Sequence, residues 1–521
     1  MSTGNVKKSS TVASVSKVSG ATAISRVLGL VREQVQAYFF GASMATDAFV
    51  AAFRIPNLLR DLFAEGALSA AFVPVFKDQL VKESEENAFA LARIVLTAIS
   101  VVVGVVVLLG IVATPLLVFI SANGFADDQP KFALTIELTR VMWVFLLMVS
   151  LSALVMGMLN SFGRFGIPAL SPALFNVGII LCVVVMYNWF DIPVYSMAIG
   201  VLVGGMAQLV ILLPQLWRIG FRFRWDFHFL DENFKRVVKM FLPMVAGLSA
   251  SRVNILISTL MASYLVEGSI SYLNYSFRVM HFPLGVFAVA LGTVTLPNAS
   301  ELAARGELDR LGSSLAEALS LNLFLIIPSA AFLALMGTDL VDVIYHWGKF
   351  SDVDTTNTGL ALLHYSYGLI GFAAVRVIVP IYYALKDSSL PMRISVISVA
   401  VNIALYYPLM KMFSFAGLAA ATSIAGLVNT GLLLFYLPRK KVTLNYGPLL
   451  LSLVRVSVAA VLAFWLAAML PIPAPSDWPG GVTRLWQFSA RFLAGGIMYL
   501  VFCAILRVNE MSLILARLRR R

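Results

Sequence analysis

The feature that most constrains this chain is a series of long, uninterrupted apolar blocks. A membrane-spanning α-helix needs about 20 mostly apolar residues, and these blocks reach or exceed that length. The short alternating segments of a transmembrane β-barrel are absent from the sequence. Only 13% of the 521 residues are charged, against about 25% in a soluble domain. The sequence therefore predicts an all-α polytopic membrane protein.

We expect fourteen transmembrane helices, separated by charged residues or by Pro and Gly. The expected helices lie at 14–40, 45–76, 88–121, 132–160, 168–189, 194–217, 237–264, 270–300, 312–336, 356–385, 390–410, 414–437, 447–470 and 485–507. The first block is too long and too rich in Gly for the apolar region of a signal peptide, so we expect it to be retained.

The distribution of Lys and Arg indicates the orientation of these helices. If the N-terminus is cytoplasmic, the basic segments at 77–93, 218–239, 439–441 and 517–521 all fall on the cytoplasmic side. The opposite side then receives only Lys131, Lys349, Lys411 and Arg484. This bias satisfies the positive-inside rule and places both termini in the cytoplasm. It also accounts for most of the net charge of +12, and no basic soluble domain is present to favour nucleic-acid binding.

Two passages of the sequence repeat at a nearly constant offset. Phe53–Arg54 is followed nine residues after the arginine by Phe63–Ala64, and Phe277–Arg278 is followed at the same spacing by Phe287–Ala288. The two arginines lie 224 residues apart. Chance similarity between short apolar segments is the alternative to a duplication.

A second pair of residues supports the duplication, since Pro168 and Pro391 open the fifth and eleventh helices 223 residues apart. A repeat of six helices gives two lobes of the same membrane orientation, with binding expected at the interface between them. We predict an N-lobe at 1–220, a C-lobe at 221–440, and two appended helices with a basic tail at 441–521. The lobes are expected to surround a central cationic cavity.

Ten arginines lie within or near the apolar blocks, although one at the bilayer centre costs on the order of 3 kcal/mol. Four of them can reach the membrane surface from a helix end: Arg140, Arg252, Arg455 and Arg491. Arg376 lies in the middle of its block and either packs between the lobes or faces the cavity. The other five lie on the first, second and eighth predicted helices: Arg26, Arg32, Arg54, Arg60 and Arg278.

Several cations in one cavity repel each other, so an anion is expected to hold them together. A diphosphate fits best, because guanidinium groups bind phosphate oxygens in a bidentate fashion. The alternative is a network of internal ion pairs with Asp47, Asp61 and Glu65 on the second helix. That helix also contains Pro56 and the segment 64–67, which predict a kink, either static or part of a gate.

The sequence does not indicate an enzyme. The four histidines and two cysteines have no metal-ligand spacing, and no phosphate-binding Gly-Lys-Ser/Thr motif is present. We therefore expect no metal and no cofactor, and active transport would have to draw on an ion gradient, the membrane potential or the gradient of the substrate.

Several stretches of the sequence together resemble one family of membrane proteins. They are Ser25–Gly29 (SRVLG), Gly41–Phe49 (GASMATDAF), Pro56–Arg60 (PNLLR), Phe63–Ala67 (FAEGA) and Tyr383–Asp387 (YALKD). With the helix count, they resemble the MurJ (MviN) lipid II flippase family of the multidrug/oligosaccharidyl-lipid/polysaccharide exporter superfamily.

The resemblance implies a flippase of the bacterial inner membrane that acts in peptidoglycan biosynthesis and cell shape. It would move lipid II, an undecaprenyl-diphosphate-linked disaccharide peptide, from the cytoplasmic to the periplasmic leaflet by alternating access. The segment 441–521 would form a groove for the lipid tail. Membrane lipids and the cell-wall synthesis machinery are the expected partners of a monomeric protein.

The resemblance also implies which residues bind the substrate. The cavity arginines of the family correspond to Arg26, Arg32, Arg60 and Arg278. The family's polar positions on the second helix correspond to Asp47, Asn57 and Glu65. Arg54 falls where relatives can carry lysine. The resemblance therefore implies that its positive charge matters more than the planar shape of its guanidinium group.

One departure from the family concerns sodium. Some relatives bind sodium through a membrane-embedded aspartate on the seventh helix, whereas the matching region here offers only Ser251, Asn254 and Asn402. We therefore expect no such site and consider the membrane potential, worth about 2.3 kcal/mol per charge per 100 mV, as the driving force.

Three other functions are alternatives to a lipid II flippase. A flippase for another polyprenyl-diphosphate sugar would need the same arginines, and only the resemblance favours lipid II. A multidrug exporter would need acidic or aromatic cavity walls for its mostly cationic substrates. A membrane scaffold without transport would not depend on Arg26, Arg60 or Arg278.

Overall fold

The computed structural model describes the backbone of residues 3–65 and 67–511. Side chains are described for the same residues apart from 3–19, 64, 65, 67, 246–252, 289, 290, 293 and 294. Within these ranges every regular element is helical and no strand occurs. This confirms the predicted all-α class.

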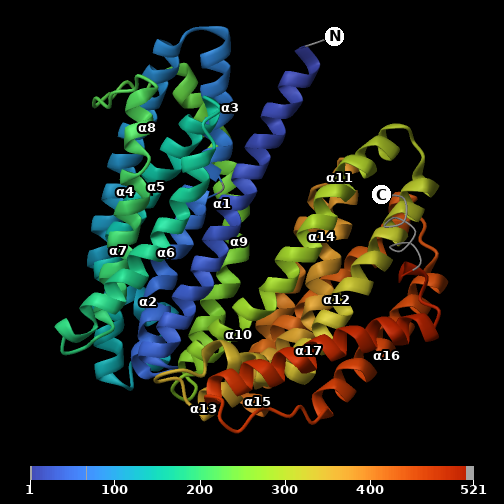
Figure 1. Ribbon diagram of the computed structural model, residues 1–521. Helices are drawn as coiled ribbons and strands as arrows, with labels where there is room; N and C mark the ends of the chain where they lie inside the picture. The colour runs from blue at the N-terminus through green and yellow to red at the C-terminus, as the bar shows by residue number, and fades with distance from the viewer. Residues whose placement is uncertain (1–2, 66, 512–521) are drawn as a thin grey trace. The chain divides into compact units, whose positions relative to one another are not determined.

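The chain divides into two compact units, residues 1–268 and 269–521. The helices of the first unit are α1 (Thr3–Phe40), α2 (Met44–Arg60), α3 (Ala67–Lys82), α4 (Glu85–Ser121), α5 (Gln129–Ser161), α6 (Gly166–Met186), α7 (Tyr195–Val210), α8 (Leu213–Arg218) and α9 (Glu232–Ser263), with a π-helical segment η1 (Asp61–Glu65) between α2 and α3 and short 3₁₀ turns η2 (Asn123–Phe125) and η3 (Tyr187–Trp189) (Figure 1).

The second unit repeats this arrangement of long helices around short connections. It comprises α10 (Ser269–Pro283), the π-helical segment η4 (Leu284–Ala288), α11 (Val289–Ala304), α12 (Leu308–Tyr345), α13 (Asp352–Ser366), α14 (Gly368–Ala384), α15 (Ser389–Tyr436), the 3₁₀ turn η5 (Leu437–Lys440), α16 (Tyr446–Met469) and α17 (Gly480–Ile505). The predicted lobe boundary at residue 220 remains a prediction based on the repeat, since the compact units divide at Gly268 instead.

Every predicted block overlaps one of these helices, but only part of them qualify individually as membrane spans. Among the described residues, eight helices are long and apolar enough to cross a membrane, and nine if α13 and α14, bent by 42° at their junction, form one span. α15 is counted as one span, although its helical geometry is interrupted at Ser414, where φ is 52°. The break separates the predicted helices 390–410 and 414–437, and the count of fourteen stays a prediction.

Local sequence signals begin several of these helices. Ser84 Oγ accepts a hydrogen bond from the Asn87 N–H at the start of α4, over 3.1 Å, and Asp231 does the same for Phe234 at α9, over 2.9 Å. α13 begins with a reciprocal capping box between Ser351 and Asp354. These side chains satisfy N–H groups that the first turn of a helix leaves without a partner.

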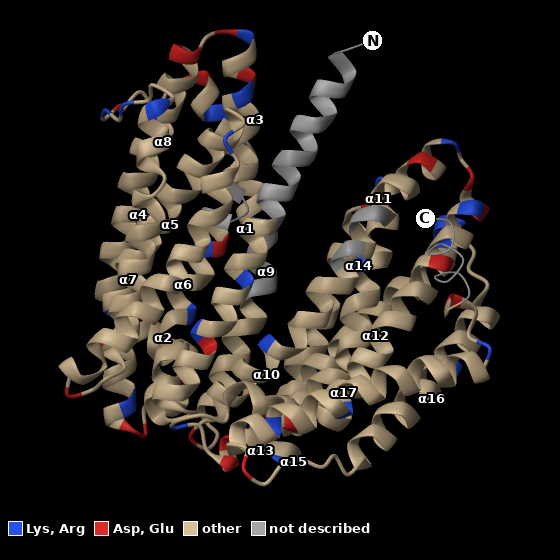
Figure 2. Cartoon of the chain, in the orientation of Figure 1, with Lys and Arg blue, Asp and Glu red and all other residues tan. Residues whose placement is uncertain are grey.

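The interior of the first unit is built from large apolar side chains of α3, α4 and α5, including Phe72, Phe76, Trp143 and Met158. α6 and α7 approach closely through glycines, because a Cβ on Gly178 would lie 2.5 Å from the Cα of Gly204. Small residues at helix interfaces allow this packing inside membranes. In both units Lys, Arg, Asp and Glu gather at helix ends, while the middle of the helices is mostly uncharged (Figure 2).

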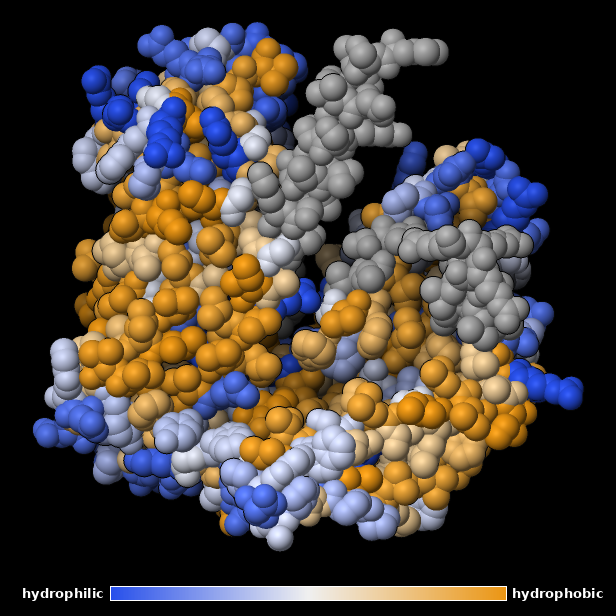
Figure 3. All heavy atoms as spheres, viewed as in Figure 1, coloured by the Kyte–Doolittle hydropathy of each residue, from blue (hydrophilic) through white to orange (hydrophobic). Residues whose placement is uncertain are grey.

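On the side shown in Figure 3, apolar side chains cover each unit between these charged ends. Many large ones are exposed, among them Leu108 and Val112 of α4 and Leu450, Val454 and Val458 of α16. Exposed apolar residues spread over a wide belt are expected where lipid, not water, surrounds the helices. The structure is thus that of a multi-pass membrane protein.

The two predicted repeat segments share an irregularity that the sequence comparison did not use. α2 passes into α3 through η1, which contains Phe63 and Ala64, and α10 passes into α11 through η4, which contains Phe287 and Ala288. π-helical segments are rare, so their occurrence at corresponding places favours a duplication. In the second helix the irregularity lies at 61–65 and not at Pro56, which α2 accommodates in its interior.

Candidate functional site

The residues of the predicted cationic site come from both units. Arg26 and Arg32 lie on α1, Arg54 and Arg60 on α2, and all four belong to the first unit. Arg278 lies on α10 of the second unit, at the place in the repeat that Arg54 occupies in the first.

Arg32 is held between a carboxylate and an aromatic ring. Its guanidinium donates to Glu33 Oε1 over 2.5 Å, and its central carbon lies 6.0 Å from the centre of the Phe175 ring on α6. Both side chains are mostly buried, with 12% of the Arg32 side chain and 4% of the Glu33 side chain exposed. This setting orients the guanidinium plane and leaves a small part of it accessible.

An aromatic cluster connects this arginine to the second helix. The cluster consists of Phe49, Phe53, Phe145 and Phe175, with the rings of Phe53 and Phe175 stacked at a centroid distance of 6.3 Å. Phe53 directly precedes Arg54 on α2. The cluster therefore joins the segment of α1 around Arg32 to the segment of α2 that carries Arg54.

α1 rests on α6 around a small residue. A Cβ on Gly29 would come no closer than 3.8 Å to the Asn176 Nδ2, and that nitrogen donates to the Ser25 carbonyl oxygen over 3.3 Å. Arg26 follows Ser25, and its side chain is exposed. The contact with α6 thus anchors the helix segment from which Arg26 projects.

At the end of α2, Arg60 donates to its neighbour Asp61 over 3.2 Å, with about one fifth of the arginine side chain exposed. Asp61 begins the π-helical segment η1. Asn57 lies one turn earlier on α2 and is half-buried. The predicted acidic member Glu65 ends η1, and its side chain lies outside the described residues.

Asp47 occupies a different environment from the arginines. It is 1% exposed, and its Oδ2 accepts bonds from Lys131 Nζ over 3.0 Å and from the Gly268 N–H over 2.8 Å. The Lys131 ammonium also lies 4.2 Å from the centre of the Phe125 ring. The sequence predicted Lys131 on the non-cytoplasmic side without a partner, and in the structure its side chain is only 7% exposed.

In the second unit, Arg278 is exposed on α10 between the buried residues Ser276 and Val279. Two of the other arginines in the apolar blocks donate to carbonyl oxygens just beyond the ends of α17 and α16. Arg455 donates to the Arg507 carbonyl oxygen over 3.1 Å, and Arg491 donates to the Leu470 carbonyl oxygen over 3.2 Å. The side chain of Arg252 lies outside the described residues.

The residues weighed for sodium binding offer few charged ligands. Asn402 is buried on α15, where its amide donates to the Tyr406 hydroxyl over 3.0 Å, and the Ser251 side chain is outside the described set. Among the side chains that the structure describes, no three His, Cys, Asp or Glu residues are grouped so that they could hold a metal ion.

Comparison with known proteins identifies close relatives. The family described as "Lipid II flippase MurJ" matches residues 36–480. The "Probable lipid II flippase MurJ" of Bdellovibrio bacteriovorus is 35% identical over 419 residues, 80% of each chain. The "Lipid II flippase MurJ" of Burkholderia cenocepacia is 34% identical over 428 residues, 81% of this chain and 83% of the relative.

Solved structures show the same fold. A structure of "Lipid II flippase MurJ, inward closed conformation" aligns with a TM-score of 0.78 at 27% identity, covering 94% of this chain and 98% of that one. An inward-facing "multidrug resistance MATE family transporter of the MOP superfamily" aligns with a TM-score of 0.67 at 13% identity, over 80% of this chain and 94% of the transporter. At that identity the second match bears on the fold alone.

Proposed function

Because the chain belongs to the lipid II flippase MurJ family, we propose that its membrane-embedded arginines bind the diphosphate of lipid II during translocation. The chain is a lipid II flippase of the inner membrane, and its substrate and surrounding lipids follow from that family. The part proposed here is how this chain's own residues hold the substrate as it passes from the cytoplasmic to the periplasmic leaflet.

The observation that carries the proposal is the setting of Arg32. Its guanidinium is oriented by Glu33 and Phe175, and Phe175 stacks on Phe53 beside Arg54. A guanidinium whose position is already set loses less conformational entropy when it binds an anion. In a low-dielectric surrounding its attraction to a phosphate is also stronger than in water.

The other arginines contribute in two ways. Arg26 and Arg278 are exposed on their helices and can approach the diphosphate from α1 and α10. Arg60 keeps one partner in Asp61, which limits its repulsion from the other cations while no substrate is bound. Arg54 adds positive charge, and Asn57 can donate a hydrogen bond to the diphosphate or the first sugar.

Release into the outer leaflet then requires that these groups change their access from one side of the membrane to the other. We propose that alternating access moves the arginines of α1 and α2 relative to that of α10. α16 and α17 carry exposed apolar side chains such as Leu462 and Leu493, and these helices would hold the undecaprenyl tail in the groove predicted for 441–521.

Several further features belong to the same proposal. The flippase acts as a monomer with both termini in the cytoplasm, catalyses no covalent step and needs no cofactor. It delivers lipid II to the cell-wall synthesis machinery on the periplasmic side. Asp47 is a structural residue in this scheme, since its carboxylate is already engaged by Lys131 and Gly268.

The proposal is tested by complementation in cells depleted of their own flippase. Arg26→Ala, Arg60→Ala and Arg278→Ala should each fail to support growth, with the protein present in the membrane at normal amounts. Arg305→Ala is the matched control, because Arg305 is an exposed arginine paired with Glu301 at the end of α11. Growth on all three site variants would overturn the proposal.

The substrate is tested with the same variants in a transport assay. Vesicles loaded with lipid II on the cytoplasmic face are treated with an impermeant enzyme that cleaves lipid II on the outer face. Cleavage should require the unaltered chain. Cleavage of a labelled lipid II should be weakened when excess unlabelled lipid II competes for transport. Equal weakening by another polyprenyl-diphosphate sugar lipid would favour a flippase of broader specificity.

A further inference from the structure

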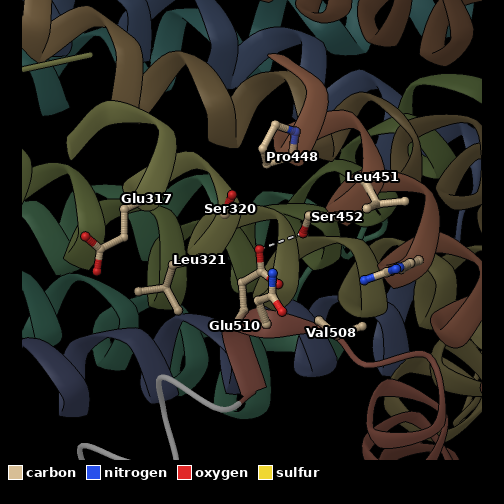
Figure 4. A pocket seen from close by; sticks show the side chains of 10 residues that line it. Glu317, Ser320, Leu321, Pro448, Leu451, Ser452, Val508 and Glu510 are labelled. Carbon is tan, nitrogen blue, oxygen red and sulfur yellow. Dashed lines mark hydrogen bonds between the residues drawn. The ribbon is translucent and has the colours of Figure 1, made fainter. Parts of the chain in front are cut away.

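A cavity lies in the second unit, and its lining includes none of the arginines proposed to bind the substrate. Its volume is about 480 Å³, and it is lined by three elements: α12, the first turns of α16, and the segment that follows α17. The polar lining residues are Glu317, Ser320, Ser452, Arg455, Asn509 and Glu510. Figure 4 shows the Ser452 and Glu510 side chains in contact at the centre of this group.

The buried carboxylate of Glu510 is the feature of this cavity that favours a bound ligand. It is 5% exposed, and its Oε1 accepts a hydrogen bond from the Ser452 hydroxyl over 2.7 Å. Its second oxygen, Oε2, is buried and has no hydrogen-bond partner among the residues that the structure describes. A buried carboxylate oxygen without a partner is costly, so a donor that enters the cavity would stabilise this arrangement.

The backbone directs Glu510 into the cavity. α17 ends at Ile505, and Arg507 takes a left-handed conformation with φ of 52°, which turns the chain back toward α16. Arg455 of α16 donates to the Arg507 carbonyl oxygen over 3.1 Å and fixes this turn. A positively charged guanidinium and a buried carboxylate therefore line the same cavity.

The position of the cavity points to the membrane surface. α12 follows the basic residue Arg305, and α16 follows the basic segment 439–441. Basic residues next to spanning helices mark the headgroup region of a membrane. Leu451 lines the cavity and is exposed, and the exposed residues Val454 and Val458 continue along the same helix. An acyl chain can follow that face while its headgroup enters the cavity.

We propose that this cavity binds a membrane phospholipid with a phosphoethanolamine headgroup, in the leaflet on the side of the basic loops. The primary ammonium donates to Glu510 Oε2, and the phosphate lies toward Arg455. The bound lipid is a stably associated membrane component and not the transported substrate. The proposal goes beyond the transport function, so its failure would leave that function untouched.

The lining distinguishes between headgroups. A phosphocholine has no N–H to give to Glu510 and is usually bound by aromatic side chains, whereas none of the described residues lining this cavity is aromatic. A phosphoglycerol has hydroxyl donors but carries no positive charge to balance a buried carboxylate. A primary ammonium carries three N–H donors and a positive charge, which matches Glu510.

The experiment measures lipid binding to the full-length protein by native mass spectrometry in detergent. The lipids share the same acyl chains and carry ethanolamine, N-methylethanolamine, N,N-dimethylethanolamine, choline or glycerol headgroups. The ethanolamine lipid should bind about tenfold more tightly than the choline lipid, as charge-assisted hydrogen bonds to a buried group allow, and affinity should fall with methylation. Equal or tighter binding of the choline or glycerol lipid would overturn the proposal.

Two variants sharpen the test. Glu510→Gln removes the negative charge and should abolish the preference for the ethanolamine headgroup, whereas Glu307→Gln, at a surface ion pair with Arg310, should preserve it. A Glu510→Gln protein that keeps the full preference contradicts the proposal. The methylation series uses the unaltered chain, so it decides the matter even if the variant does not fold.

The source of the headgroup is tested by competition. Soluble O-phosphoethanolamine has the same charged groups without acyl chains, and it should displace the lipid only at far higher concentration. Displacement at the same concentration as the intact lipid would mean that the cavity binds a small soluble molecule, and the lipid proposal would be wrong.

Discussion

At the scale of single residues, the ion pair between Asp47 and Lys131 connects three parts of the first unit. Lys131 lies on α5, Asp47 on α2, and the Gly268 N–H that Asp47 also accepts lies just after α9. Glu267, the preceding residue, accepts from the Met44 N–H at the start of α2 over 2.6 Å. Both charges are almost fully buried, so neither has water to replace its partner.

Removing one member of this pair should therefore be worse than removing both. Lys131→Met leaves a buried carboxylate and should lower the unfolding free energy by about 3 to 5 kcal/mol, as for other broken buried ion pairs. The double variant Asp47→Asn, Lys131→Met should regain part of that loss. Thermal unfolding of the purified protein in detergent measures both.

The control for this prediction is Asp352→Asn, because Asp352 pairs with His346 at 3.5 Å but is 95% exposed. Its unfolding temperature should stay close to that of the unaltered chain. If Lys131→Met were equally stable but failed in transport, Asp47 and Lys131 would act on substrate and the structural assignment would be wrong.

A second residue-scale prediction concerns Asp387, in the short loop between α14 and α15. Its carboxylate lies 2.6 Å from Lys440 Nζ in η5 and also accepts the Leu390 N–H over 3.1 Å. The hydrogen bond from Lys440, with these neighbours, lowers the pKa of Asp387 to about 2. The pair thus holds the loop against the end of α15.

A lowered pKa in the folded state means that the stabilisation is present above the unfolded pKa of about 3.9 and is lost as the pH falls toward 2. Asp387→Asn should therefore unfold at a lower temperature than the unaltered chain at pH 6, and the difference should shrink between about pH 4 and 2. Unfolding temperatures measured across this range check it, and a constant difference would contradict it.

At the scale of elements, the apolar blocks predicted the helices well and their internal breaks in part. The block 45–76 becomes α2, η1 and α3, so the irregularity overlaps the expected segment 64–67 but does not lie at Pro56. A π-helical turn depends on how the helix packs against its neighbours, and composition does not record that. The break at Ser414, by contrast, coincides with the division drawn between blocks 390–410 and 414–437.

Side-chain partners were the part that sequence could not supply. Asp47 and Lys131 lie 84 residues apart, and Glu510 and Ser452 lie 58 apart, so only the fold brings them together. In the sequence, nothing distinguishes Lys131 from a cation in a loop. In the structure, it lies on α5 with its side chain buried. Charge inside the apolar blocks selected five candidate arginines, and the family resemblance then indicated a role for them, because it carries information on function that charge and hydropathy alone do not.

The paired π-helical segments lead to a prediction about helix geometry. A π turn bonds residue i to i+5 and so holds one more residue than an α turn. Deleting Leu62 from η1 should convert the turn to α-helix and keep the residues on either side in phase. We expect a folded protein with strongly reduced transport, and the same result on deleting Val286 from η4.

The matched control is deletion of Val106 in the regular helix α4. With no extra residue to absorb the loss, the following side chains rotate by about 100° around the helix, and the protein should unfold at lower temperature. Far-ultraviolet circular dichroism and protease resistance compare the folding of the Leu62, Val286 and Val106 deletion variants. Full transport by the Leu62 deletion would show that the π turn has no role in the transport cycle.

At the scale of the whole molecule, the distribution of the candidate arginines over the two units leads to a prediction about the energy source for transport. Arg26, Arg32, Arg54 and Arg60 belong to one unit and Arg278 to the other. If access to these residues alternates, positive charge and the substrate's diphosphate shift within the electric field of the membrane. A shift of one elementary charge across the full field changes the energy by about 2.3 kcal/mol per 100 mV.

Transport in vesicles should therefore respond to the membrane potential and not to a sodium gradient. Collapsing the potential with a potassium ionophore at equal potassium on both sides should slow lipid II exposure about tenfold or more, if roughly one charge crosses most of the field. Replacing sodium by choline at constant potential should leave the rate unchanged.

Arg54→Lys keeps the charge and should keep the voltage response, whereas Arg54→Gln should weaken it. A rate that depends on sodium and ignores the potential would contradict this coupling and assign the energy to ion binding instead.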